Sequence, residues 1–298
     1  MKPEGIWLPI ITPFKEGRPD LVSYRRMIDH YIAQGIHGLV PLGTTGEAPT
    51  LDAEESERLI AETVAHVAGR VPVYVGVGGN STQAVAARLR TLENAGVQGV
   101  LSVSPYYNRP DQRGIYEHFR GLSESTPLDI LVYNIPYRTG RPVENDTIRR
   151  LAELKNIVGL KDASGNIAQT TELLLDPPED FSILCGEDAF LYTALLHGAQ
   201  GGILASAHLE TAEFLALYRQ IRSNRHQEAL TIWRSLMRFI PALFSEPNPA
   251  PLKHCLHRLG LIESDELRLP LLPVTAETRL KLNRHLDGMI PWSGVQIA

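Results

Sequence analysis

The sequence predicts an α/β protein: a (β/α)8 TIM barrel with a C-terminal extension of three helices. Short apolar runs, rich in β-branched residues, recur about every 30 residues. We assign eight of them as strands, at residues 6–11, 37–42, 71–77, 98–104, 129–133, 157–161, 181–185 and 201–205. Their apolarity is continuous rather than alternating, which is typical of parallel strands covered on both faces. Helical periodicity follows each run, so the pattern indicates repeated βα units. A doubly wound open sheet is the alternative, but it typically has fewer strands.

The expected helix boundaries agree with this order. Asp52 precedes an acidic first turn, and Ser81 precedes an alanine-rich helix; both residue types favour helix N-termini. Glycines stand where helices should end, at Gly35, Gly69 and Gly96 among others. The strand and helix assignments therefore support each other.

The strand pattern stops near residue 225, so we divide the chain into a barrel at 1–225 and a helical domain at 226–298. Residues 227–243, 250–259 and 275–286 show helical periodicity. Proline-rich turns at 247–249 and 269–273 separate them. We expect this extension to pack on the outside of the barrel and to contribute to contacts between subunits.

Composition excludes several classes of function. The 298 residues are 43% hydrophobic and carry a net charge of -5, which gives no electrostatic case for nucleic acid or an anionic membrane. No stretch of about 18 consecutive apolar residues predicts a membrane span. Cys185 and Cys255 match no zinc or redox spacing and are expected to be reduced, in a cytoplasmic protein. We expect no metal and no nucleotide cofactor, because Gly76–Asn80 lacks the dinucleotide spacing.

Lys161 ends the apolar run 157–161 and is the first candidate for chemistry. In a (β/α)8 barrel the active site lies at the C-terminal ends of the strands. A lysine in that place is most often solvated. In a partly desolvated pocket its pKa falls, and the amine becomes a nucleophile that forms an imine with a keto acid.

Other strand ends carry residues that suit the same chemistry. Thr44 and Thr45 follow the second strand within a Gly-flanked turn, whose N–H and hydroxyl groups can converge on a carboxylate. Tyr107 and Tyr133 follow the fourth and fifth strands, and their hydroxyls can relay protons. Arg138 offers a planar fork for a second carboxylate. The acids after the seventh strand, Glu187 and Asp188, are expected to cap the next helix.

The motifs at these strand ends resemble the dihydrodipicolinate synthase family, within the larger group that includes N-acetylneuraminate lyase. The resemblance rests on residues 43–47, 105–108, 133–136, 138–140 and 159–165, and on 246–249 and 267–270 in the extension. It covers nearly the whole chain in order. It implies a condensation of pyruvate with L-aspartate 4-semialdehyde to 4-hydroxy-tetrahydrodipicolinate, a step of lysine and diaminopimelate biosynthesis.

The resemblance also implies roles for particular residues. Lys161 would form the imine with pyruvate, and Thr44 and Thr45 would hold its carboxylate. Tyr133 would be the general acid and base, linked through Thr44 to Tyr107 of a neighbouring subunit. A homodimer or a homotetramer, as a dimer of dimers, would follow.

The resemblance also implies that Arg138 would bind the carboxylate of the second substrate. Gly186 and Ile203 would shape the imine pocket.

Three positions depart from the family pattern. Ala84 and Ser56 stand where lysine-inhibited members carry groups that bind lysine, so we predict weak or absent feedback by lysine. Tyr137 replaces a common small residue beside Arg138, which keeps a related pyruvate-dependent aldolase or lyase as the alternative. Arg138 itself favours the synthase. A barrel that binds pyruvate without turnover is a third, less favoured hypothesis.

Overall fold

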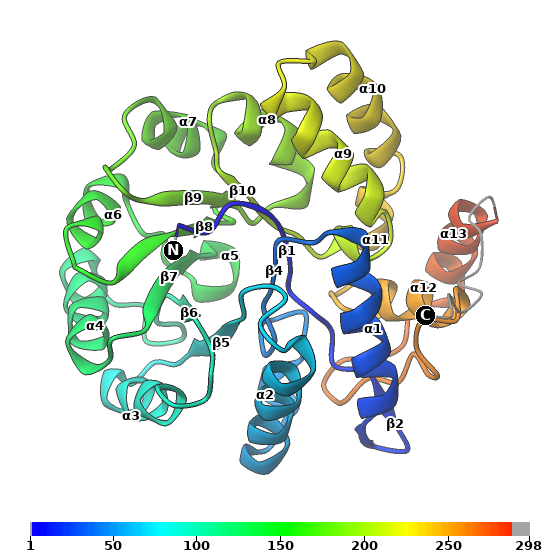
Figure 1. Ribbon diagram of the computed structural model, residues 1–298, viewed down its shortest axis with the longest axis horizontal. Helices are drawn as coiled ribbons and strands as arrows, with labels where there is room; N and C mark the ends of the chain where they lie inside the picture. The colour runs from blue at the N-terminus through cyan, green and yellow to red at the C-terminus, as the bar shows by residue number, and fades with distance from the viewer. Residues whose placement is uncertain (1, 288–298) are drawn as a thin grey trace.

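A closed barrel of parallel strands forms the centre of the computed structural model, which describes residues 2–287 (Figure 1). The strands are β1 (Gly5–Leu8), β4 (Gly38–Leu39), β5 (Tyr74–Gly78), β6 (Gly99–Val103), β7 (Asp129–Asn134), β8 (Ile157–Asp162), β9 (Ser182–Cys185) and β10 (Gly201–Ile203). They form one eight-stranded sheet in the order β4-β1-β10-β9-β8-β7-β6-β5. A parallel bridge between Leu39 and Val73 joins its two edges. The predicted (β/α)8 barrel is confirmed, and an open doubly wound sheet is excluded.

The helices that alternate with these strands form the outer layer, as Figure 1 shows. They are α1 (Leu21–Gln34), α2 (Ala53–Val67), α3 (Thr82–Leu92), α4 (Gln112–Ser125), α6 (Asn145–Ala152), α7 (Ile167–Leu175), α8 (Leu191–Leu196) and α9 (Thr211–Arg222). The caps expected at Asp52, Ser81 and Gly35 are present, but α2 has its C-cap at Ala68 instead of Gly69, and α3 has its C-cap at Glu93 instead of Gly96. Asp52 and Glu55 form a capping box, Ser81 caps α3, and Gly35 ends α1 with φ of 94°.

The loops between the strands and helices contain several short elements. They are the hairpin β2 (Phe14–Lys15) with β3 (Arg18–Pro19), helix α5 (Pro136–Thr139), and the 3₁₀ turns η1 (Ala48–Thr50), η2 (Asp188–Phe190) and η3 (Ser206–His208). Helix α5 directly follows β7, so the residues of this one-turn helix lie at the C-terminal face of the barrel.

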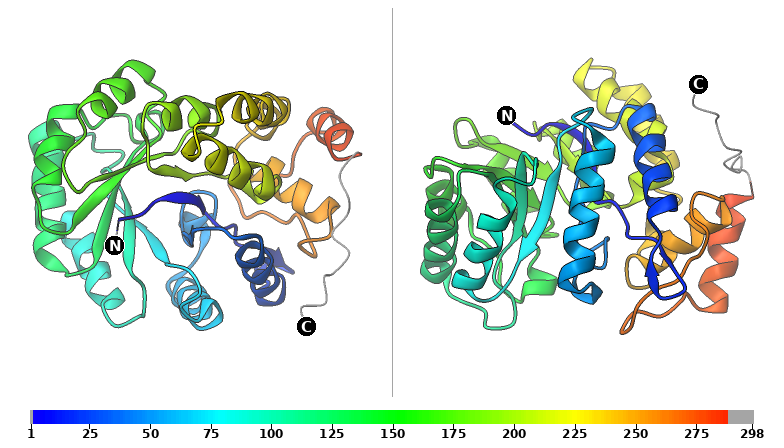
Figure 2. Two further views of the ribbon diagram at one scale, coloured as in Figure 1. Left: turned by 45° about the horizontal axis from the view of Figure 1, so that its top comes forward. Right: turned by 60° about the horizontal axis from the view of Figure 1, so that its bottom comes forward.

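The C-terminal extension contains α10 (His226–Leu236), α11 (Ile240–Leu243), α12 (Ala250–Arg258) and α13 (Ala276–Leu286). The predicted single helix at 227–243 is wrong. The chain breaks after α10 and restarts at α11, where Pro241 occupies the first turn and can donate no hydrogen bond to a preceding turn. Figures 1 and 2 show α12 and α13 to one side of the barrel, near α1. The domain boundary between residues 225 and 226 stays a prediction.

Two apolar layers hold the barrel together. Inside it lies a cluster of Trp7, Val40, Tyr74, Leu101, Leu131, Tyr133, Ile135, Ala163, Leu184 and Ile203. A larger cluster fills the space between the sheet and the outer helices. Cys185 and Cys255 are free and buried, as expected. Within residues 2–287 no helix has both the length and the apolarity needed to cross a membrane.

Candidate active site

Lys161 and Tyr133 lie side by side at the C-terminal face of the barrel. Tyr133 on β7 is the direct register partner of Lys161 on β8. The Nζ atom of Lys161 lies 4.2 Å from the centroid of the Tyr133 ring. Both side chains are buried, with 6% and 7% of their surface exposed. The predicted neighbours therefore meet, although 27 intervening residues separate them in the sequence (161 minus 133, less one).

Burial makes Lys161 an unusually nucleophilic amine. Loss of water around the ammonium lowers its pKa from 10.5 to about 8, while the negative charge of Asp188 acts in the opposite direction. At pH 7 this shift increases the neutral, reactive fraction of the amine about 300-fold. Because burial is the main cause of the lowered pKa, the apolar surroundings of Lys161 contribute directly to its reactivity.

Tyr133 is kept as a neutral phenol. Burial raises its pKa well above the ordinary value, and a hydrogen bond with the Thr44 side chain acts against this rise. A phenol that stays protonated at neutral pH can donate a proton to a nearby oxygen. The structure thus brings Tyr133, Thr44 and Lys161 together in one place.

Hydrogen bonds from other residues and within the loop itself fix the loop that carries Thr44 and Thr45. The Thr12 hydroxyl donates to the Gly46 carbonyl at 2.8 Å, and the Gly46 N–H donates to the Gly43 carbonyl at 3.0 Å. The Thr45 hydroxyl is buried and accepts a hydrogen bond from Asn248 Nδ2 at 2.9 Å. Thr44 is half-buried and lines the cleft described below.

Gly186 leaves room for the lysine chain. A Cβ atom at this position would lie 2.8 Å from Lys161 Cγ and 2.9 Å from its Cε. The Gly186 N–H donates to the Asp162 carbonyl at 2.7 Å, which fixes the backbone beside β8. Ile203 is buried in the apolar cluster inside the barrel, together with Tyr133. Their part in an imine pocket stays a prediction.

A cleft of about 520 Å³ lies beside Thr44 and Tyr133, and Lys161, Gly186 and Ile203 are not among the residues that line it. Its walls include Thr44, Tyr133, Ile135 and Arg138. Arg138 lies on α5 with an exposed side chain, and its guanidinium carbon is 5.2 Å from the Tyr137 ring centroid. Within the described part of the chain no carboxylate forms an ion pair with Arg138. Its charge is therefore available to an anionic ligand in the cleft.

Tyr107 is not part of this arrangement in the single chain. It lies in the loop after β6, where it is 89% exposed and its backbone has a φ of 70°. The neighbouring Tyr106 lines the cleft instead. Within one chain the structure brings Thr44, Tyr133 and Lys161 together, and the roles of the predicted site residues stay predictions.

The expectation for the two acids after β9 is wrong. Neither caps η2 or α8 with its side chain. Asp188 is buried and accepts a hydrogen bond from the Ser206 N–H at 2.6 Å, across to the end of β10. Its pKa is raised by burial. The sequence offered no local sign of this contact, because the partner lies 18 residues further on.

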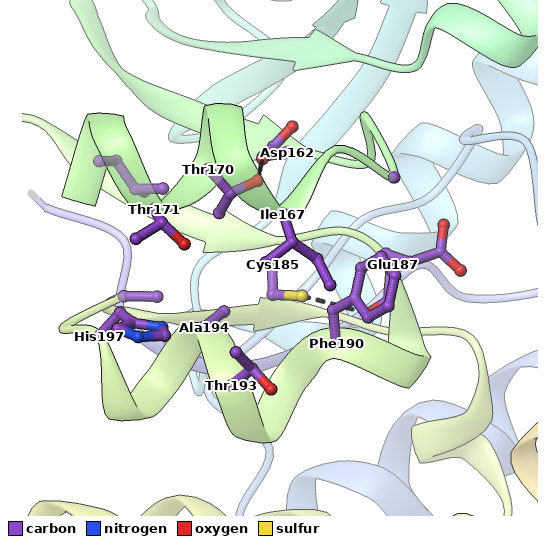
Figure 3. A pocket seen from close by; sticks show the side chains of 13 residues that line it. Asp162, Ile167, Thr170, Thr171, Cys185, Glu187, Phe190, Thr193, Ala194 and His197 are labelled. Atoms are coloured by element: carbon purple, nitrogen blue, oxygen red, sulfur yellow. Dashed lines mark hydrogen bonds between the residues drawn. The ribbon is translucent and has the colours of Figure 1, made fainter.

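A second, smaller cavity lies between α7 and α8, outside β8 and β9, and measures about 20 Å³ (Figure 3). Asp162 lines it and accepts hydrogen bonds from the Thr170 hydroxyl and, at 3.0 Å, from the Ser164 N–H. Cys185 donates to the Glu187 carbonyl at 3.1 Å. These contacts anchor the ends of β8 and β9 next to Lys161, and the cavity itself has room for about one water molecule.

The barrel with a buried lysine at a strand end agrees with the class of protein that comparisons with known proteins give: a lyase of the class I aldolase type, in which a lysine forms a Schiff base with a carbonyl substrate. The chain belongs to the dihydrodipicolinate synthetase family, whose sequence profile matches residues 2–289.

Individual relatives agree with this assignment. The chain is 54% identical over 286 residues to 4-hydroxy-tetrahydrodipicolinate synthase 2 of Clostridium acetobutylicum, covering 96% of this chain and 100% of the relative. The crystal structure of dihydrodipicolinate synthase from Thermotoga maritima matches with a TM-score of 0.93 at 38% identity, over 95% of this chain and 97% of that one. The enzyme from Aquifex aeolicus matches with a TM-score of 0.94 at 35% identity, over 98% and 100%.

Proposed function

We propose that this protein is a 4-hydroxy-tetrahydrodipicolinate synthase, which condenses pyruvate with L-aspartate 4-semialdehyde. The observation that carries this proposal is the contact of Lys161 with Tyr133, a desolvated amine against a neutral phenol. The relatives named above carry this activity in their names. Arg138, free for a second carboxylate, supports an acceptor that is an amino acid aldehyde.

The first half of the reaction uses the amine and the phenol in turn. The neutral Lys161 amine attacks the keto carbon of pyruvate, and the C–N bond forms as the carbonyl oxygen takes up a proton. Tyr133 donates a proton to the resulting hydroxyl, which leaves as water and gives the imine. The Tyr133 phenolate left by this step then takes a proton from the methyl group, which forms the enamine and restores the phenol. Thr44 and Thr45 hold the pyruvate carboxylate throughout, with Gly186 and Ile203 enclosing the new bond.

The second half forms the carbon–carbon bond. The enamine carbon attacks the aldehyde carbon of the second substrate, whose carboxylate is bound by Arg138, and the aldehyde oxygen takes a proton from Tyr133. The amino group of this substrate then adds to the imine carbon and expels Lys161. The ring closes, and the free amine is restored for the next cycle.

Tyr107 points to a site completed by a second copy of the chain. Its ring is exposed next to the cleft-lining Tyr106, and we propose that it joins the proton relay of a neighbouring subunit in a homodimer or a dimer of dimers. One of the structural relatives, at a TM-score of 0.93, is described as a monomeric dihydrodipicolinate synthase variant, so the fold alone does not dictate the assembly.

Mixing two inactive variants tests this arrangement. Tyr107→Phe keeps Lys161 intact, and Lys161→Met keeps Tyr107 intact. If the tyrosine is supplied by the partner, mixed dimers contain one complete site and recover activity. No recovery on mixing, with mixed dimers shown to form, would contradict the shared site.

A panel of acceptors tests the activity itself. The protein is incubated with pyruvate and borohydride, and Lys161 is examined by mass spectrometry. The rates with aspartate semialdehyde and with sugar-derived aldehydes are then compared as kcat/KM. We expect trapping at Lys161 and a preference for aspartate semialdehyde. Absence of trapping would exclude both enzyme hypotheses and leave only the hypothesis of a barrel that binds pyruvate without turnover.

A second candidate function rests on Tyr137. Its ring is 69% exposed beside Arg138, so it narrows the approach to the guanidinium group. A preference for a longer, sugar-derived aldehyde would identify a related pyruvate-dependent aldolase. The cytoplasmic location expected from the sequence stays a prediction.

A further inference from the structure

A fully buried ion pair lies at the end of residues 43–47, the segment that carries Thr44 and Thr45 and that we call the threonine loop. The Lys253 ammonium group contacts Glu47 Oε1, and both side chains have 0% of their surface exposed. Glu47 ends the loop that carries Thr44 and Thr45, and it adopts a left-handed backbone conformation with φ of 54°. Lys253 comes from α12, in the C-terminal extension.

Further contacts enclose this pair. Lys253 Nζ donates to the Glu266 carbonyl at 2.9 Å and lies 4.2 Å from the Phe14 ring centroid. Glu47 Oε2 accepts a hydrogen bond from the Arg268 N–H at 3.2 Å. The Arg268 guanidinium binds both carboxylate oxygens of Glu55, at 2.5 and 2.6 Å. The extension thus contacts both the threonine loop and α2 with charged groups.

Stability alone does not explain a charged pair in this position. Removing two charges from water costs free energy, and apolar residues of similar volume often stabilise a protein equally well. Burial is strong enough to lower the pKa of Lys253 to about 8, although Glu47 favours its charged form. A non-glycine residue in the left-handed region is also strained, and such strain persists only where the surroundings fix the backbone.

We propose that Lys253 is a positioning residue for pyruvate: its ammonium fixes Glu47, and Glu47 orients Thr44 and Thr45 toward the substrate carboxylate. This inference rests on the proposed role of the two threonines. The same segment of the extension contributes Asn248, whose amide donates to the Thr45 oxygen. Because that oxygen already accepts a hydrogen bond, the Thr45 hydroxyl proton is left to point toward an anion.

Two variants separate positioning from folding. Lys253→Met leaves the Glu47 carboxylate buried without its cation, so it should lower the unfolding midpoint as well as the affinity for pyruvate. In the double variant Glu47→Gln with Lys253→Met, no buried charge is left unpaired, and the midpoint should return close to that of the wild type. Its KM for pyruvate should stay about tenfold higher, equivalent to about 1.4 kcal/mol, with little change in kcat.

Arg26→Met provides a matched control. Arg26 on α1 also joins the barrel to the extension, through Nη2 to the Leu261 carbonyl at 2.8 Å and through an ion pair with Glu263. This variant should lower the unfolding midpoint without changing KM for pyruvate. The pyruvate dependence of borohydride trapping at Lys161 gives an independent readout in all four proteins.

The outcomes are distinct. A double variant with the midpoint and KM of the wild type would overturn the inference, and so would an equal rise of KM in Arg26→Met. Failure of the proposed function appears differently, as absence of pyruvate trapping in the wild-type protein itself. A raised KM for pyruvate that is confined to the variants at positions 47 and 253 would support the positioning role of Lys253.

Discussion

Replacing Gly186 by alanine should disable the amine without unfolding the barrel. The added Cβ would lie 2.8 Å from Lys161 Cγ, 2.9 Å from Cε and 3.1 Å from Ala163 Cβ. Carbon atoms pack best at about 3.5–4.0 Å. The lysine chain must therefore shift by about 0.7 Å or more, away from Tyr133 or out toward the cleft.

The size of the effect follows from that shift. A displacement of about 1 Å of a reacting group costs about 100-fold in rate, which corresponds to about 2.7 kcal/mol. Alanine fits the backbone here, because Gly186 does not have a positive φ and its N–H bond to Asp162 is unaffected. We expect the rate constant of imine formation with pyruvate to fall about 100-fold.

The assay is borohydride trapping at Lys161 as a function of time, with the thermal unfolding midpoint measured in parallel. Gly202→Ala is the matched control, since its Cβ would lie 3.0 Å from Leu191 and Leu204 side-chain atoms and not against Lys161. The control should lose stability and keep its trapping rate. A folded Gly186→Ala protein that traps pyruvate as fast as the wild type would refute the reasoning.

Three further results are expected. The rate of imine formation should rise with pH and level off above about 8, the pKa of Lys161; a plateau that begins only near pH 10 would contradict the desolvated site. Lys161→Met should stabilise the protein at pH 7 by about 3 kcal/mol, because the folded state holds this lysine with a lowered pKa. That gain is complete below pH 8 and shrinks as the pH rises toward 10.5, so urea unfolding at both ends of this range checks the sign. Lysine should not reach half-inhibition below about 1 mM, because Ala84 and Ser56 offer it no carboxylate or aromatic group; a steady-state inhibition curve decides.

Local patterns in the sequence were enough to predict the barrel and the meeting of Lys161 with Tyr133. Each βα unit carries its own signals, such as Asp52 at the start of α2 and Gly35 at the end of α1. Because strand ends in a parallel barrel meet at one face, placing Lys161 and Tyr133 at strand ends was sufficient to bring them together. The strand lengths were less accurate, since β1 ends at Leu8, before Pro9.

Contacts between distant segments were not predictable in this way. Asn248 and Thr45 are 203 residues apart, and no periodicity or capping rule relates them. Lys253 lies within a helix and has the sequence context of an ordinary surface lysine, yet it is fully buried. The break at Pro241 did have a local signal, because proline favours the first turn of a helix over its interior.

The seam that closes the barrel has a consequence for amide exchange. Strand β4 contains only two residues, and it meets the opposite edge through the Leu39–Val73 bridge and through hydrogen bonds from the Leu39 N–H to the Pro72 carbonyl and from the Gly76 N–H to the Pro41 carbonyl. Both prolines lack an N–H, so neither can return a bond. Short, sparsely bonded segments open first in native-state fluctuations. The amides at this seam should therefore exchange with deuterium before those of β7 and β8. The seam includes Pro41, which lies two residues before the threonine loop.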